Sequence, residues 1–153
     1  MPTSSRFAVA VHVLALLARA GDEPLKSERI ARSVNTNPVV IRRILCALAR
    51  AGLVASQTGA AGGTRLARAP REITLREVYR AVEPRVIFAL HRRRPNRRCP
   101  VGGGIKEVLA DVLAEVDAAV DAALERKTIE TVLESLKSCG ARGAKGLSRS
   151  PGR

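Results

Sequence analysis

Aromatic residues are almost absent from this chain, which has no Trp, one Tyr and two Phe among 153 residues. Its core must therefore be built from aliphatic side chains and alanine, which favours helices. The scarcity also argues against the aromatic platforms that stack bases of RNA or single-stranded DNA. We expect a mainly helical protein.

Acidic residues are also few, with 14 Asp and Glu against 27 Lys and Arg, so the net charge is +13. A surplus of this size predicts a polyanionic partner, which is nucleic acid or an anionic membrane. No apolar run reaches the ~18 residues of a membrane span, and no signal peptide is evident. We therefore expect no membrane partner and a cytoplasmic location.

Groupings of catalytic residues are missing as well. No Ser/His/Asp, Cys/His or paired-carboxylate set can be recognised, so we expect no catalytic residues and no enzyme. The three cysteines are an odd number and widely spaced, which implies no disulfide framework and fits a reducing compartment.

Two short helices in residues 27–52 have the spacing of a helix-turn-helix. Ser27 is a candidate cap for "ERIARSV", and Asn35 suits the left-handed turn that follows. Asn37 then caps "PVVIRRILCALARAG", with Pro38 at its first position. Small and apolar residues around a short turn are typical of this motif.

The next segment, "TGAAGGTRLA", raises a choice between a phosphate loop and the tip of a hairpin. A phosphate loop needs Lys and a hydroxyl after the last glycine, or a helix starting there. Thr64 and Arg65 follow Gly63 instead and no helix starts there; "LVAS" before the glycines is predicted to be a short strand, and "TRLAR" after them the returning strand. We interpret the segment as the wing of a winged helix-turn-helix, in which Gly62 and Gly63 permit close backbone approach to a partner.

DNA contact is expected from the start of the second helix and from the wing. Residues there can meet base edges, and arginines off the apolar face can bind bases or phosphates, although a solvated-surface role is open for each arginine. The predicted DNA-binding residues are Arg6, Thr36, Asn37, Val39, Val40, Arg42, Arg43, Arg50, Gly62, Gly63 and Arg65.

A long helix is predicted from residue 105 onward, with acidic residues between its apolar positions. Its stripe could complete an intramolecular core or form a dimer seam, and we favour the seam because paired recognition helices would read a palindrome. The predicted interface consists of Ile105, Val108, Leu109, Val112, Leu113, Val116, Val120 and Leu124. Thr74 and Glu77 form a capping box for an earlier helix, and Thr128 caps a last short one.

From residue 5 to residue 135 the chain resembles the Rrf2-type winged helix-turn-helix transcription regulators. The resemblance is carried by "AGLV", by the G-x-x-GG wing followed by "LA", and by "ITLREVYRAVE". It implies a homodimer, held by the long helix, that represses genes from a palindromic operator. "PNRRCPVG" before the long helix resembles the subgroup without an iron–sulfur cluster.

Cys99 is the candidate sensing residue. Cluster-binding members of the family carry three cysteines before the long helix, whereas Cys46 and Cys139 lie elsewhere here, so we expect no metal and no cofactor. Cys99 follows Arg92, Arg93, Arg94, Arg97 and Arg98, with Arg85 further back, and these cations could favour its thiolate. A redox switch and a buried structural cysteine both remain open, whereas Cys46 is expected to be a small packing residue.

The predicted fold class is mainly α with a small β-hairpin. We expect a winged helix-turn-helix DNA-binding domain over residues 1–84, a connecting loop with Cys99 over 85–104, dimerisation helices over 105–137 and a disordered basic tail over 138–153. The predicted function is a regulator, with double-stranded DNA and a second copy of the chain as partners and the small effector unknown. The alternative is a general nucleic-acid binding module without sequence specificity.

Overall fold

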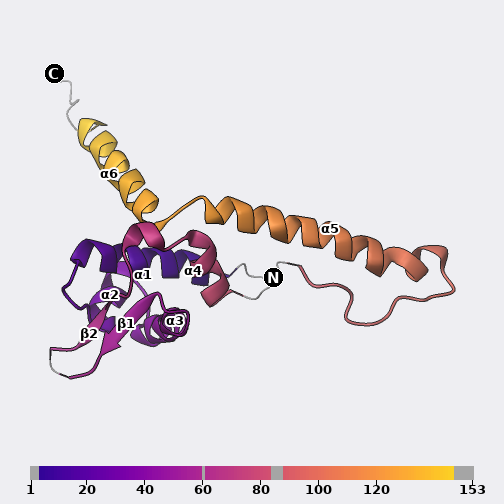
Figure 1. Cartoon of the computed structure of the whole chain (residues 1–153), viewed down its shortest axis with the longest axis horizontal. Coiled ribbons are helices and arrows are strands. Elements are labelled where there is room, and N and C mark those ends of the chain that lie inside the picture. The colour runs from indigo at the N-terminus through magenta and orange to yellow at the C-terminus, as the bar shows by residue number, and fades with distance from the viewer. Residues whose placement is uncertain (1–3, 60, 84–87, 147–153) are drawn as a thin grey trace, which may run out of the picture.

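The computed structural model describes residues 4–59, 61–83 and 88–146, with side chains up to Cys139. Its architecture is mainly helical with one two-stranded hairpin, which confirms the predicted fold class (Figure 1). The elements in order are α1 (Arg6–Ala20), α2 (Ser27–Val34), α3 (Pro38–Arg50), β1 (Val54–Gln57), β2 (Gly63–Leu66), η1 (Pro70–Glu72), α4 (Leu75–Val82), α5 (Pro100–Glu125) and α6 (Ile129–Gly146). Within these described ranges, no helix is both long enough and apolar enough to cross a membrane.

Helix α1 is the centre of the core. Leu14 and Leu17 are fully buried, and Ile30 of α2 and Ile41 and Leu48 of α3 are buried with them. Aliphatic side chains therefore fill the interior, as the scarcity of aromatic residues requires. Because Ile41 and Leu48 lie on the inner face of α3, the opposite face of that helix is left to solvent.

The turn between α2 and α3 has the predicted chemistry. Asn35 adopts the left-handed conformation with φ 57°, and the Asn37 side chain accepts a hydrogen bond of 2.8 Å from the backbone N–H of Val39. The predicted cap of α2 is wrong: Lys26 occupies that position and Ser27 is the first helical residue. The Ser27 hydroxyl donates to Glu28 instead, at 3.2 Å.

The wing is an antiparallel hairpin in which Val54 pairs with Leu66 and Gln57 with Gly63. It is joined to the preceding chain by Leu25, which exchanges two backbone hydrogen bonds of 2.9 Å with Thr64. The side chain of Thr64 is buried at this junction. The hairpin is therefore tied to the helical core at its base.

Helix α4 packs against α5 and holds it to the winged domain. The predicted capping box of Thr74 and Glu77 is present. Arg76 contacts Glu125 of α5 at 3.1 Å, and both Arg76 and Arg80 pair with Asp121. From this junction α5 extends away from the winged domain, and its first turns lie far from it (Figure 1). Exposed ion pairs of this kind contribute ~1 kcal/mol or less each, so they orient α5 more than they stabilise it.

Two boundaries differ from the prediction. Helix α5 begins at Pro100 rather than near residue 105, because proline suits the first helical position and the glycines after it are absorbed into the first turns. Helix α6 continues to Gly146, past the predicted start of the tail at residue 138, since an established helix adds residues at little cost. The end of the predicted tail, residues 147–153, lies outside the described residues.

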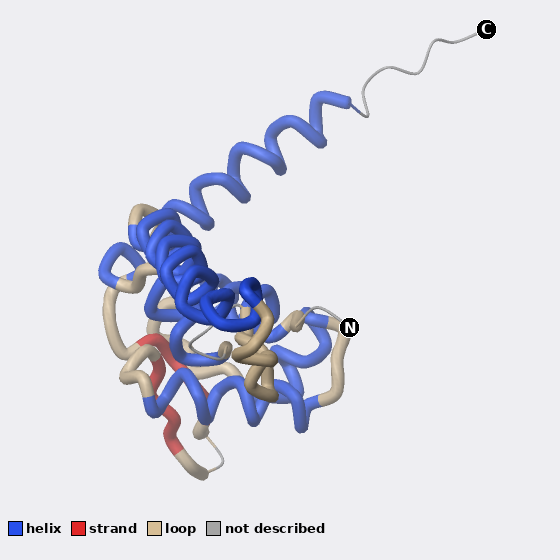
Figure 2. The backbone as a smooth tube through the Cα atoms, turned by 90° about the vertical axis from the view of Figure 1, so that its right-hand side faces the viewer, coloured by secondary structure: helices blue, strands red, loops and turns tan. Residues whose placement is uncertain are grey.

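The start of α6 is part of the core. Ile129 is fully buried, and its N–H donates to the Ile73 carbonyl at 3.0 Å, while the Leu75 N–H donates to the carbonyl of Lys127 at 2.8 Å. Thr128 accepts a hydrogen bond from the Thr131 N–H at 3.3 Å, which confirms it as the cap. Figure 2 shows α6 leaving this point in a different direction from α5.

Candidate nucleic-acid interface

The outward stripe of α3, hereafter the recognition stripe, consists of Val39, Arg43, Cys46 and Arg50. All four are exposed, and their spacing of three or four residues places them on the side opposite the buried face. The Asn37 cap fixes where the helix begins, and its side chain accepts a hydrogen bond from the Val39 N–H. The stripe thus combines apolar and cationic groups on a rigid element. Cys46, expected to be a small packing residue at the edge of this helix, is exposed.

Arg42 lies on the flank of α3 that faces α2. Its guanidinium contacts Glu28 at 2.5 Å and the Ser27 hydroxyl at 3.3 Å. The backbone N–H of Glu28 and the Arg42 guanidinium lower the pKa of the Glu28 carboxyl below its ordinary value. Arg42 is therefore paired inside the motif, whereas no ion pair is formed by Arg43 within the residues that the structure describes.

The other predicted contacts occupy the ends of helices. Arg6 begins α1 and Arg50 ends α3, and both side chains are exposed. Thr36 is half-buried beside the cap, and the Asn37 oxygen is engaged in capping, so Asn37 can offer its amide NH₂ to a partner.

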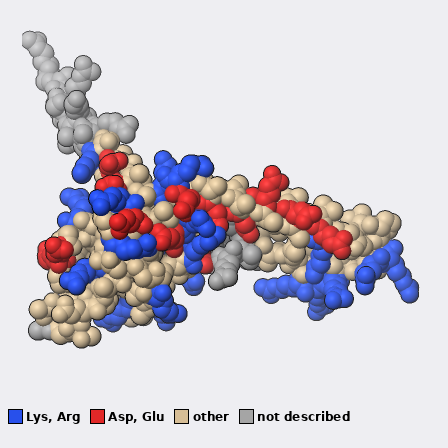
Figure 3. Space-filling view, viewed as in Figure 1, with Lys and Arg blue, Asp and Glu red and all other residues tan. Residues whose placement is uncertain are grey.

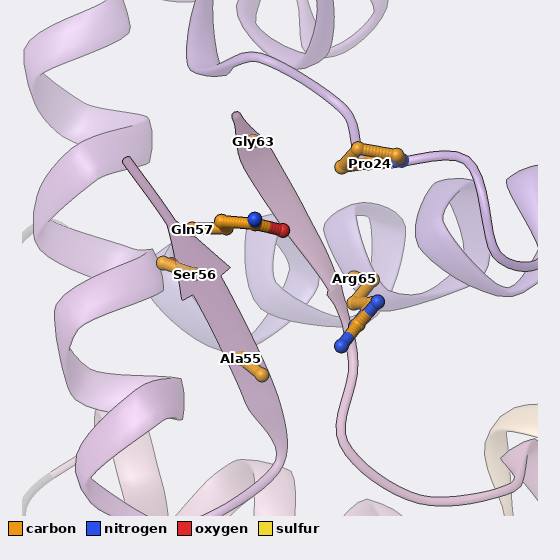
Figure 4. Close-up of a pocket in the computed structure, with 6 residues that line it drawn as sticks. All are labelled: Pro24, Ala55, Ser56, Gln57, Gly63 and Arg65. Atoms are coloured by element: carbon orange, nitrogen blue, oxygen red, sulfur yellow. The ribbon is translucent and has the colours of Figure 1, made fainter. Parts of the chain in front are cut away.

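The glycines of the wing serve the chain's own backbone. A Cβ at Gly62 would lie 2.3 Å from the Gln57 carbonyl oxygen, and one at Gly63 would lie 2.9 Å from that of Leu25. Gly62 thus lies close to the backbone of the hairpin itself, and Gly63 lies close to the backbone of the segment that precedes α2. Arg65 is exposed on β2 and lines a hollow with Gln57 and Pro24 (Figure 4).

Cys99 is exposed and occupies the capping position before α5. The backbone N–H groups of Gly102 and Val101 lower the pKa of its thiol below the ordinary value. We expected the pKa of this thiol to be lowered, and it is, but the cause is the backbone amides at the start of α5 rather than the preceding arginines. A buried structural role is contradicted. Arg85 lies outside the described residues.

Charge is unevenly arranged around α5. Acidic side chains form a row along the helix, and basic side chains gather beneath its far end (Figure 3). The basic group belongs to the segment before Cys99, in which Arg92, Arg93, Arg94, Arg97 and Arg98 are all exposed.

The apolar stripe of α5 is only partly covered. Val108 is 60% exposed and Val112 49%, and among the described residues none of this helix is buried. All eight predicted interface residues lie on α5, half-buried at most.

These features define a winged helix-turn-helix domain followed by a long helix. The chain belongs to the Rrf2 family of transcriptional regulators, because the family model, described as iron-dependent transcriptional regulators, matches residues 3–135. Its DNA-binding character and its role in regulation follow at the level of the family.

Known relatives agree with this assignment. The chain is 42% identical over 134 residues to YwnA of Bacillus subtilis strain 168, named as an HTH-type transcriptional regulator, and the match covers 87% of this chain and 98% of that protein. A crystal structure described as a DNA-binding protein has a TM-score of 0.69 at 39% identity, covering 84% of this chain and 99% of that one. CymR, the global cysteine regulator of B. subtilis, has the same fold with a TM-score of 0.65 at 22% identity, covering 88% of this chain and 98% of that one.

The family's description raises the question of an iron site, and the donor residues do not fit one. Across the described part of the chain, no three His, Cys, Asp or Glu side chains come together as a metal ion would require. Cys46 lies on α3, Cys99 before α5 and Cys139 on α6, each exposed and unpaired with another cysteine. Iron–sulfur clusters need several protein ligands around one centre, and the described residues offer no such set.

Proposed function

We propose that this protein is a transcriptional regulator that binds double-stranded DNA sequence-specifically. It acts as a homodimer and represses transcription from a palindromic operator. The observation that carries the proposal is the recognition stripe on α3, where exposed Val39 lies one turn from Arg43, which forms no ion pair with the described residues. In a helix-turn-helix this second helix enters the major groove. The wing adds Arg65 for the phosphate backbone.

The partly exposed stripe of α5 supports the homodimer. This helix of 26 residues leaves Val108 60% and Val112 49% exposed, so a partner could still bury apolar surface on that side. A second copy offers an identical stripe, and a two-fold interface is self-complementary. Two recognition helices related by that axis would read the two halves of a palindrome.

Cys99 supports a thiol-based signal. Backbone amides lower its pKa, so more of the thiol is present as thiolate at neutral pH, and the sulfur is exposed to oxidants. With hydrogen peroxide the thiolate sulfur gains one oxygen to give sulfenic acid, and hydroxide leaves. Oxidation replaces the thiolate, whose negative charge the amides at the start of α5 favour, so we expect it to alter the helix proposed to hold the dimer and to release DNA.

Fluorescence anisotropy tests this function. The probe is the duplex immediately upstream of the protein's own gene, compared with a scrambled duplex over a salt series. Preferential binding of the upstream duplex, with affinity that falls steeply as salt rises, is expected for a specific regulator. Equal, weak binding to this duplex, to the scrambled duplex and to RNA would favour the general nucleic-acid binding module instead.

The signal is tested separately from the binding. Peroxide should weaken binding of the wild-type protein and leave the Cys99→Ser variant unchanged. A double variant with Cys46→Ser and Cys139→Ser, in which Cys99 is the remaining thiol, should respond like the wild type. Loss of the response in the double variant would place the sensing thiol elsewhere.

A further inference from the structure

We infer that α3 reads the methyl groups of thymine through Val39 and Val40, so that each operator half-site carries thymine at fixed positions. This inference rests on the proposed function and adds the chemical feature that the recognition helix selects. Its starting point is exposure: Val39 is 48% exposed and Val40 40%, although both are apolar and lie on the element that faces DNA in this motif.

The local structure holds both valines rigidly at the start of the helix. The Asn37 cap bonds to the Val39 N–H at 2.8 Å, the Val40 N–H donates to the Asn37 carbonyl at 2.9 Å, and Ile41 next to them is fully buried. Valine also has one strongly preferred side-chain rotamer in a helix. The two side chains therefore present a fixed apolar surface and lose little conformational freedom when they bind.

Thymine is the base that this surface fits. Valine has no donor or acceptor and cannot read the hydrogen-bonding pattern of a base edge, whereas the 5-methyl group of thymine is the apolar feature of the major groove. Arg43 lies one turn along from Val39 and supplies hydrogen-bond donors beside the apolar pair. The helix is thus suited to a mixed half-site with thymine methyls next to a guanine or a phosphate.

The test begins with selection of binding sequences from a randomised duplex library by the full-length protein. We expect enriched sequences to share thymines at the same places in both half-sites. A selected duplex is then synthesised with deoxyuridine at each such thymine in turn, which removes the methyl group and keeps every hydrogen-bonding group. Each effective replacement should weaken binding about fourfold, the factor for one buried methylene.

The variants assign that effect to the two valines. Val39→Ala and Val40→Ala should each remove most of the difference between thymine and deoxyuridine at one position, since alanine lacks both methyl groups that valine presents. Val101→Ala, at an exposed valine of α5, should keep the full difference. Circular dichroism of the variants should match the wild type, because alanine favours a helix.

The outcomes separate this inference from the proposed function. A selected sequence that binds equally well with thymine and deoxyuridine would overturn the inference and leave sequence-specific binding intact. Discrimination that persists in both α3 variants would also overturn it. A library that yields no enriched sequence would overturn the proposed function together with the inference.

Discussion

Replacing Val108 and Val112 with serine should separate the proposed dimer, and the size of the effect follows from their exposure. Full burial of a valine contributes about 1.5 kcal/mol, and these two side chains are 60% and 49% exposed on α5. About half of that contribution is therefore still to be gained at each position when a partner covers it. Counting both positions in both protomers gives about 3 kcal/mol, or roughly a 150-fold weaker dimer.

Sedimentation velocity over a concentration series measures this change directly. The control variant carries Ala114→Ser and Ala118→Ser, two exposed positions on the opposite side of α5, and should dimerise like the wild type. A double-serine variant at positions 108 and 112 that dimerises within threefold of the wild type would refute the reasoning, as would a wild-type protein that remains monomeric at high concentration.

Three further predictions address DNA contact, acid sensitivity and the core. Arg43→Ala should weaken operator binding by about 1–3 kcal/mol in anisotropy titrations, and Arg42→Ala by less, because Arg42 already pairs with Glu28. Burial alone would raise the pKa of the Glu77 carboxyl, but Arg68 and Thr74 lower it by more, so the net shift is downward. The stability that ionised Glu77 adds should therefore be lost as the pH falls through its folded-state pKa. Urea unfolding over a pH series should show this loss for the wild type, and Glu77→Gln should flatten it. Ile129→Ala should lower the free energy of unfolding in urea by about 2–5 kcal/mol, against less than ~0.5 kcal/mol for exposed Leu136→Ala.

Local chemistry explains why much of the fold could be predicted. Asn35 and Asn37 have conformational preferences that act within a few residues, and both behave as their positions predict. The capping box at Thr74 and the helical spacing of α5 are local signals of the same kind. The prediction of Ser27 as the cap was wrong because the helix begins one residue earlier: Lys26 is in the capping position, and the Ser27 hydroxyl donates to Glu28.

What the sequence did not reveal depends on contacts between distant residues. The pairing of Leu25 with Thr64 joins positions far apart in the chain, and nothing local marks Leu25 as a partner of the hairpin. Likewise, Ile129 is buried in a core whose other members lie far from it in the sequence, and its N–H donates to the carbonyl of Ile73. The pairing of Arg42 with Glu28 is also tertiary: helical spacing distinguishes inner from outer residues but does not show which outer arginine a neighbouring helix will engage.

The length of α5 has a consequence for the DNA that the dimer could occupy. Its 26 residues span about 39 Å at ~1.5 Å per residue, and α4 joins its C-terminal end to the winged domain. If two such helices paired antiparallel over their full length, they would hold one winged domain at each end of a rod slightly longer than one turn of B-DNA, which is about 34–36 Å. The spacing between half-sites would then be set by the length of α5 rather than by any residue that touches DNA. Binding to operators with spacers of different lengths would measure the distance between the two winged domains.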